Sequence, residues 1–269
     1  MPAKLAPERT RGPIIACGEL PANQRTPALL ARILGLAGES PRLVLVCAPE
    51  RDEDDIELET LLAAAGTTNP HRFALGARAD AEKRDLLDLV EQAGMVMFEA
   101  RQALRLSTLI GGTSLARLVR RRNADGMAVC GVGAGAALLC EHMLATGAQG
   151  PTPRMGGTSL APGLGLTNRV VIDQGGHASD RLGRLLAALA LNPFALGLGI
   201  DAATFGVIGA DNVLDVVGSG GVTVIDPSEM ADSNVAEVDP GAPIRITNLR
   251  LHSLTGGARY DLDFRRTIG

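Results

Sequence analysis

The feature that most constrains this sequence is a short apolar run leading into a turn dense in glycine. Residues 127–130 read Met-Ala-Val-Cys, and residues 131–136 read Gly-Val-Gly-Ala-Gly-Ala, with a helical pattern continuing through Leu144. Strand, tight turn and helix form the layout of a nucleophile elbow, G-x-S-x-G, whose turn lifts one side chain to the top of a sheet. That position is Gly133 here. The pattern therefore predicts the turn without the attacking atom.

Strand-like and helix-like segments alternate along most of the chain. Strands are expected at 13–17, 43–47, 71–75, 95–98 and 170–173, and helices at 28–37, 56–65, 81–93, 101–109, 114–122 and 181–191. Closely spaced strands with glycine turns follow at 204–208, 213–217, 222–225, 244–246 and 249–252. Such alternation predicts an α/β fold, in which a mostly parallel sheet is sandwiched by helices and the C-terminal part is β-rich and antiparallel. We expect a flexible tail at 1–12 and one domain at 13–269.

Composition limits which side chains can form the core and which classes of partner the protein can bind. Hydrophobic residues make up 46% of the chain but aromatic residues only 2%, so the core must be built from aliphatic side chains. The net charge of −4 and the absence of a long basic run argue against a nucleic-acid interface. The basic cluster 117–122 has helical spacing and is expected to be a solvated helix end. With no apolar run of membrane length, we expect a cytoplasmic protein that does not enter a membrane.

The four cysteines, Cys17, Cys47, Cys130 and Cys140, show no C-x-x-C spacing. Three of them lie in apolar runs that are typical of buried strands. This pattern predicts reduced, buried thiols rather than a disulfide framework or a zinc site. We expect neither a metal site nor a cofactor.

Four stretches of the sequence carry motifs of one protein family. Residues 98–113 resemble F-T-G-G-[DN]-Q-L-R-L and a following Gly-Gly-Thr turn, and residues 131–143 resemble G-T-S-A-G-A and its helix. Residues 161–185 resemble G-L-G-L followed by D-Q-H-F-x-x-R-x-R-x-G-R-L, and residues 218–251 resemble V-x-G-x-G-x-V-T-V-x-D and S-N-x-x-E-V-x-P-G. The chain thus resembles the cyanophycinase family of serine peptidases from about residue 13 to 262. The resemblance implies a class I glutamine-amidotransferase-like fold, dimers, and a substrate such as cyanophycin or a β-aspartyl peptide.

The residues that this resemblance would make catalytic are replaced. The family's nucleophilic serine falls on Gly133, its histidine on Gly175, its acid on Ala202, and its oxyanion glycine pair on Ala-Arg at 100–101. A serine peptidase needs a nucleophile, a base and an acid, and removing the nucleophile or base alone costs about 10⁶-fold in turnover in subtilisin. We therefore expect no intact catalytic residue. His177, two residues past the empty histidine position, is a weak replacement candidate.

Other positions of the family motifs are retained. The residues expected to bind a ligand are Gln102, Asp173, Gln174, Arg181 and Arg184. Gln102 is included because the substrate-side glutamine of the family falls on Ala103, one residue away. Arginine binds carboxylates with a two-pronged fork, which suits an Asp/Arg-containing peptide or a small acidic ligand. The alternative is a structural network where the strand meets the helix.

Three hypotheses for the function follow. The first is a catalytically inactive binding or partner subunit, either a homodimer or a heteromer with an active paralogue. The second is an active hydrolase that uses residues we have not identified. The third treats residues 131–136 as a G-x-G-x-x-A dinucleotide turn, although no acidic residue ends a strand about 20 residues later, as that fingerprint expects.

Overall fold

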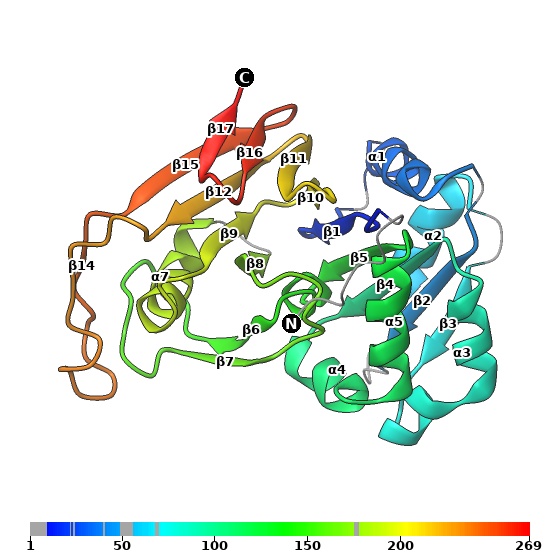
Figure 1. Cartoon of the computed structure of the whole chain (residues 1–269), viewed down its shortest axis with the longest axis horizontal. Coiled ribbons are helices and arrows are strands. Elements are labelled where there is room, and N and C mark those ends of the chain that lie inside the picture. The colour runs from blue at the N-terminus through cyan, green and yellow to red at the C-terminus, as the bar shows by residue number, and fades with distance from the viewer. Residues whose placement is uncertain are drawn as a thin grey trace.

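The alternating N-terminal segments form the parallel part of a large sheet (Figure 1). The computed structural model describes residues 10–21, 23, 25–39, 41–48, 56–67, 70–174 and 178–269. Five parallel strands lie in the order β1 (Ile14–Cys17), β5 (Ala128–Gly133), β4 (Met95–Ala100), β2 (Leu43–Cys47) and β3 (His71–Ala74). Strands β1, β2, β4 and β5 are almost entirely buried, as expected for apolar runs covered on both faces.

The C-terminal strands are divided between two sheets. Four antiparallel strands extend the large sheet beyond β1: β10 (Thr204–Ile208), β11 (Val213–Gly218), β16 (Arg259–Asp261) and β17 (Arg266–Ile268). A second sheet has the order β15 (Arg250–Thr255), β12 (Gly221–Asp226), β9 (Leu196–Ile200) and β8 (Val170–Gln174). Two small antiparallel pairs join β6 (His142–Gly147) to β7 (Thr158–Pro162) and β13 (Asp232–Ser233) to β14 (Ile246–Thr247). The α/β class and the antiparallel ending are as predicted.

Helices cover both faces of the large sheet. The helices are α1 (Thr26–Leu34), α2 (Ile56–Ala64), α3 (Arg84–Glu91), α4 (Ala103–Ile110), α5 (Ser114–Ala124), α6 (Gly135–Leu138) and α7 (Ala178–Leu191), with 3-10 turns η1 (Gly35–Ala37) and η3 (Arg78–Glu82). Leu30 of α1 and Leu62 of α2 pack against one face, while α3, α4 and α5 bury leucine, isoleucine and valine against the other. Helix α7 packs on the second sheet through Leu185 and Leu189. Among the described residues, no helix has the length and apolarity needed to cross a membrane.

The helix after the glycine turn is much shorter than predicted. Helix α6 ends at Leu138, whereas the sequence pattern predicted helix through Leu144. The reason is the loop 163–166, whose backbone N–H groups bond the carbonyls of residues 138–141 and so take the acceptors that further helix would use. The prediction of a helix was therefore wrong for Cys140, whose backbone forms an isolated β-bridge with Thr167. It was also wrong for His142, which is the first residue of β6.

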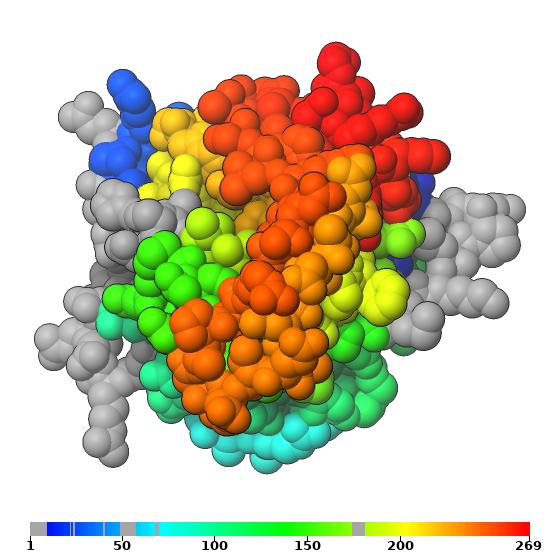
Figure 2. Space-filling view, turned by 90° about the vertical axis from the view of Figure 1, so that its left-hand side faces the viewer, coloured from blue at the N-terminus to red at the C-terminus, as the bar shows by residue number. Residues whose placement is uncertain are grey.

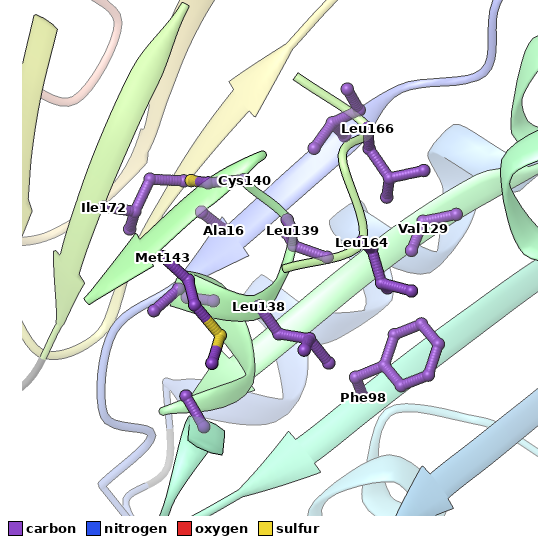
Figure 3. Close-up of a cluster of buried hydrophobic side chains, with 14 of the residues drawn as sticks. Ala16, Phe98, Val129, Leu138, Leu139, Cys140, Met143, Leu164, Leu166 and Ile172 are labelled. Carbon is purple, nitrogen blue, oxygen red and sulfur yellow. The ribbon is translucent and has the colours of Figure 1, made fainter. Parts of the chain in front are cut away.

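Figure 3 shows how deeply this short helix is buried. Leu138 of α6 lies among Phe98 of β4, Leu164 of the returning loop and Met143 of β6. All four side chains are less than 3% exposed. The end of β5 and the start of α6 therefore lie within a packed core, which holds the glycine turn in place.

The segment 227–249, which joins β12 to β15 and which we call the arm, crosses the outer face of α7. Figure 2 shows this arm, coloured orange, running across the face of the molecule below the C-terminal strands. The strand expected at 244–246 is only the two-residue β14 within this arm. Ile244 packs there against Ala187 and Ala190 of α7. The arm thus packs on α7 through a cluster separate from the one that joins α7 to the second sheet.

Candidate functional site

The structure forms the predicted elbow at the carboxyl end of β5. Gly133 ends the strand with φ +57°, in the left-handed region, and α6 begins at Gly135. A Cβ on Gly131 would lie 2.2 Å from the carbonyl oxygen of Gly135, and a Cβ on Gly135 would lie 2.2 Å from that of Phe98. These two glycines therefore allow β4, β5 and α6 to approach closely, as a sharp strand-to-helix turn requires.

The backbone donor next to the elbow is already occupied. In a nucleophile elbow, the N–H of the residue after the nucleophile helps to bind the oxyanion of the reacting carbonyl. Here that N–H belongs to Ala134, and it donates to the carbonyl oxygen of Ala100 at 2.8 Å. Ala100 is paired with Gly133 in the β4–β5 ladder, so the sheet continues to the apex of the turn. The site thus lacks an open oxyanion donor at this position.

Two of the three replaced triad positions meet in one pocket, which we call the elbow pocket. It has a volume of about 460 Å³ and lies at the carboxyl ends of β1, β2, β4 and β5. Gly133 and Ala202 both line it, whereas Gly175 and His177 lie outside the described residues. Two acidic residues, Glu19 and Glu99, also line this pocket. The carboxyl ends of parallel strands are where α/β sheets of this kind bind ligands.

The predicted ligand-binding residues gather in an adjoining pocket, which we call the basic pocket. It has a volume of about 300 Å³ and is lined by Gln102, Asp173, Arg181 and Arg184, among others. Gln174 follows Asp173 in β8, and its backbone is paired with β9, while its side chain lies outside the described residues. The structure therefore brings four of the five predicted residues together.

Asp173 and Arg184 are engaged with each other. Arg184 donates from Nε to Oδ2 of Asp173 at 2.6 Å and from a terminal nitrogen to Oδ1, which is a two-pronged pair. The side chain of Asp173 is 5% exposed and that of Arg184 is 16% exposed. This pair fits the alternative role of these residues, a structural network linking β8 to α7. Arg181 and Gln102 also line the basic pocket, and their role in ligand binding stays a prediction.

Sequence reasoning missed one charged residue that lines the basic pocket. Arg101 lines both the elbow pocket and the basic pocket, so it forms part of the wall between them. The signal was present in the sequence, because Arg101 replaces one of the oxyanion glycines that the family resemblance implies. The resemblance by itself accounts for this replacement only as a loss of catalytic function.

Three of the cysteines, Cys17, Cys130 and Cys140, offer no substitute nucleophile. All four are free and buried. Burial raises the pKa of the Cys130 thiol to about 12, and it raises the pKa of the Cys140 thiol to about 12 despite a hydrogen bond with the backbone of Ile172. Burial, and secondarily the neighbouring Cys130, raise the pKa of Cys17 well above its usual value. A thiol with such a pKa stays protonated at neutral pH and is inert.

Two further sequence hypotheses can be compared with the geometry. A dinucleotide turn needs free N–H groups at the start of a helix, but α6 has only four residues and the N–H of Ala134 is already bonded. Within the described part of the chain, no group of three or more His, Cys, Asp or Glu side chains is placed to hold a metal ion.

Comparison with known proteins points to one family. No protein-family model matches the chain. A cyanophycinase of Trichormus variabilis is 30% identical over 266 residues, covering 97% of this chain and 89% of that protein. A cyanophycinase of Synechococcus elongatus is 39% identical over 189 residues, covering 70% of this chain and 59% of that protein.

Solved structures support the same fold. A peptidase from an acI-B1 Actinobacterium superposes with a TM-score of 0.61 at 17% identity, covering 92% of this chain and 98% of that one. A putative peptidase E protein from Listeria monocytogenes EGD-e superposes with a TM-score of 0.50 at 9% identity, covering 77% of this chain and 98% of that one. From these relatives and the retained motifs, we conclude that the chain belongs to the cyanophycinase-like S51 peptidase family.

Proposed function

We propose that this protein binds a small ligand, such as an Asp/Arg-containing peptide, without hydrolysing it, and acts as a binding or partner subunit in cyanophycin or β-Asp-Arg metabolism. One observation carries the proposal. The apex of the elbow is a glycine, and the N–H beside it is bonded to the carbonyl of Ala100. Both the attacking atom and the oxyanion donor of a serine hydrolase are thus missing from the place where the fold would supply them.

The other parts of the catalytic site support the same proposal. Ala202 lines the elbow pocket at the position of the family acid, and its methyl group cannot orient a base. The histidine position carries Gly175 in the sequence. The basic pocket nevertheless retains arginine and glutamine side chains beside the elbow. Loss of catalytic groups with retention of polar pocket residues is the pattern expected of a protein that binds a ligand and does not cleave it.

We expect no hydrolysis by the purified protein or by the Gly133→Ser variant. A serine hydroxyl without a base keeps its proton and is a weak nucleophile, and a missing oxyanion donor costs about 10²–10³ in rate. The assay measures dipeptide or free amino acid released from cyanophycin and from β-Asp-Arg against a buffer blank. The triple variant Gly133→Ser, Gly175→His, Ala202→Glu is the comparison that restores all three triad positions.

The same assay can overturn the proposal. Saturable turnover by the wild-type protein, retained after further purification, would establish the alternative of an active hydrolase. If that turnover were lost on replacing His177, the catalytic base would be identified. Turnover by Gly133→Ser alone would mean that a base is already present, and His177 would be the first residue to replace.

The proposed role as a subunit predicts self-association or association with an active relative. Only five phenylalanines occur in the chain, and two of them, Phe194 and Phe264, are 87% and 72% exposed. Aromatic side chains are enriched at protein interfaces. We expect light scattering to give the mass of a dimer, either for the isolated protein or for a mixture co-expressed with an intact paralogue. A monomer in both samples would contradict the role as a subunit.

A further inference from the structure

One turn in the C-terminal part of the chain is held by a buried ion pair. Residues 262–265 join β16 to β17, and Arg265 in this turn has φ +52°, in the left-handed region that favours glycine. Arg265 donates to Oδ1 of Asp226 at 2.5 Å, and the side chain of Asp226 is 0% exposed. It also donates to the carbonyl oxygen of Phe194 at 2.8 Å. The strained turn is therefore held against both β12 and the loop that follows α7.

This contact brings two exposed aromatic side chains to one corner of the molecule. Phe264 precedes Arg265 in the turn and is 72% exposed, and Phe194, whose carbonyl Arg265 binds, is 87% exposed. Figure 2 shows the C-terminal strands, coloured red, at the surface. We call the surface formed by Phe194, the turn 262–265 and β17 the C-terminal corner. Backbone strain and exposed aromatic side chains both cost free energy, and together they are typical of an interaction surface.

The same corner contains an open sheet edge. In the described part of the chain, β17 pairs only with β16 and forms one edge of the large sheet (Figure 1). The backbone N–H and C=O groups on the outer side of an edge strand can pair with another strand. Because β17 has only three residues, such pairing gives few hydrogen bonds. The aromatic side chains must therefore supply most of the stability of any contact, and β17 fixes its register.

The charges of the corner allow two copies of the chain to meet. The net charge of the chain is −4, so two copies repel each other on average. Among the described residues, each charged residue of the turn and of β17 has an oppositely charged neighbour: Arg265 has Asp226, Asp263 has Arg169 at 2.7 Å, and Arg266 lies opposite Asp261 in the β16–β17 ladder. The corner is thus locally neutral, and a second copy can approach it without like-charge repulsion.

We propose that two copies of this chain associate through the C-terminal corner, with their β17 strands paired antiparallel about a two-fold axis. The proposal rests on the proposed role as a subunit, since it names the surface and the partner for that role. The register that pairs all three residues of β17 places Thr267 opposite Thr267 of the second copy and Arg266 opposite Ile268 of the second copy. The contact is isologous, because each copy contributes the same surface. The large sheet then continues from one copy into the other.

The apolar area at the corner is consistent with a stable dimer. A standard interface buries about 800 Å² on each partner. An aromatic side chain buries about 150–250 Å², so Phe194 and Phe264 together supply about 300 Å² on each copy. Leu251 of β15 is 58% exposed and pairs with Ile225, next to Asp226, so it adds further apolar area beside the corner. The two phenylalanines are therefore the residues whose loss should weaken the dimer most.

Sedimentation equilibrium on the full chain over a concentration series tests the surface. We expect the wild type to form a dimer. Phe194→Asp and Phe264→Asp should each raise the dissociation constant by at least about 30-fold, as expected when a central interface residue is replaced by a charge. Leu36→Asp is the matched control, because Leu36 is a 45% exposed apolar residue outside the corner. It should leave the dissociation constant unchanged, and the melting temperature of each variant shows that it is folded.

Disulfide cross-linking of the Thr267→Cys variant tests the register. Opposite residues of an antiparallel pair have Cα atoms about 4.5–5.5 Å apart, which a disulfide can span. Oxidised glutathione takes up the two electrons and two protons of the thiols and becomes two molecules of glutathione. We expect a covalent dimer on a non-reducing gel for Thr267→Cys. The wild type, whose four cysteines are buried, and Leu36→Cys should give none.

Each result decides one part of the proposal. A wild type that stays monomeric, or a dimer whose dissociation constant is the same in Phe264→Asp and Leu36→Asp, would overturn the assigned surface. A missing cross-link in a Thr267→Cys dimer would overturn the pairing of β17. Association with an active paralogue alone would overturn self-association while supporting the proposed role as a subunit. Hydrolysis of cyanophycin by the same samples would refute the proposed function, whichever surface the copies use.

Discussion

Replacing Gly135 by alanine is expected to destabilise the protein by about 4 kcal/mol or more, which places it among the most damaging single substitutions. The new Cβ would lie 2.2 Å from the carbonyl oxygen of Phe98 and 2.9 Å from its carbonyl carbon. Both atoms belong to the backbone of β4, whose pairing with β5 fixes them in the centre of the sheet. No side chain can rotate away to relieve the contact, so the strand or the turn must move. Urea unfolding followed by circular dichroism measures the effect.

Two glycine substitutions provide controls of graded severity. Gly133→Ala places its Cβ 3.1 Å from the carbonyl oxygen of Ala100 and retains a left-handed φ of +57°, so a cost of about 1–2 kcal/mol is expected. Gly35→Ala meets no atom within 4 Å at an ordinary helical φ of −59° and should stabilise the protein by about 0.4–1 kcal/mol. If Gly135→Ala cost no more than Gly133→Ala, the close approach of α6 to β4 would be wrong.

Replacing Asp173 by alanine should cost about 3–5 kcal/mol in the free energy of unfolding, because it leaves Arg184 with an uncompensated, largely buried charge. Asp173 comes near the end of β8 and Arg184 lies on α7, so the pair joins the second sheet to the helix that covers it. A carboxylate held by two guanidinium donors is among the stronger ionic contacts in proteins. Thermal unfolding and urea unfolding both report this loss.

Two further variants serve as controls for Asp173→Ala: one breaks an exposed ion pair, and the other removes both charges of the buried pair. Asp232→Ala breaks the ion pair between Asp232 and Arg245. The side chain of Asp232 is 49% exposed and that of Arg245 is 60% exposed, so the free energy of unfolding should fall by no more than about 1 kcal/mol. The double variant Asp173→Leu, Arg184→Met removes both buried charges and should recover much of the stability lost in Asp173→Ala. Equal costs for the buried and exposed pairs would contradict the structural role that we assign to Asp173.

The fold class was predictable because its signals are local. Runs such as 43–47 and 95–98 are apolar throughout, since both faces of the strands are covered, and they appear in the structure as β2 and β4. The elbow was equally accessible, because its strand, its glycine turn and the start of its helix are contiguous in the sequence. Gly131 is required by a contact with Gly135 inside this unit, whereas Gly135 is required by a contact with Phe98 of β4. The α6 boundary was not accessible, because the helix is ended by the loop 163–166, which lies about 25 residues later in the chain.

The candidate site also has features that the sequence predicts and features that only the structure reveals. The sequence indicated which side chains are absent at Gly133 and Ala202, and the structure places both in the elbow pocket. It could not indicate that the N–H of Ala134 is bonded to Ala100, because that contact depends on how far the β4–β5 ladder extends. The sequence could likewise not indicate that Arg184 forms an ion pair with Asp173, because that contact depends on the packing of α7 against β8.

The sequence by itself determined the α/β architecture, the glycine turn and the loss of the triad residues that the family resemblance implies, because periodicity, turn chemistry and residue identity are properties of short segments. Only the tertiary structure decided which retained polar side chains are engaged with each other and which line a pocket. It also decided that Arg101 lies between the elbow pocket and the basic pocket. The physical reason is that burial, pairing and pocket shape arise between segments that are distant in the chain.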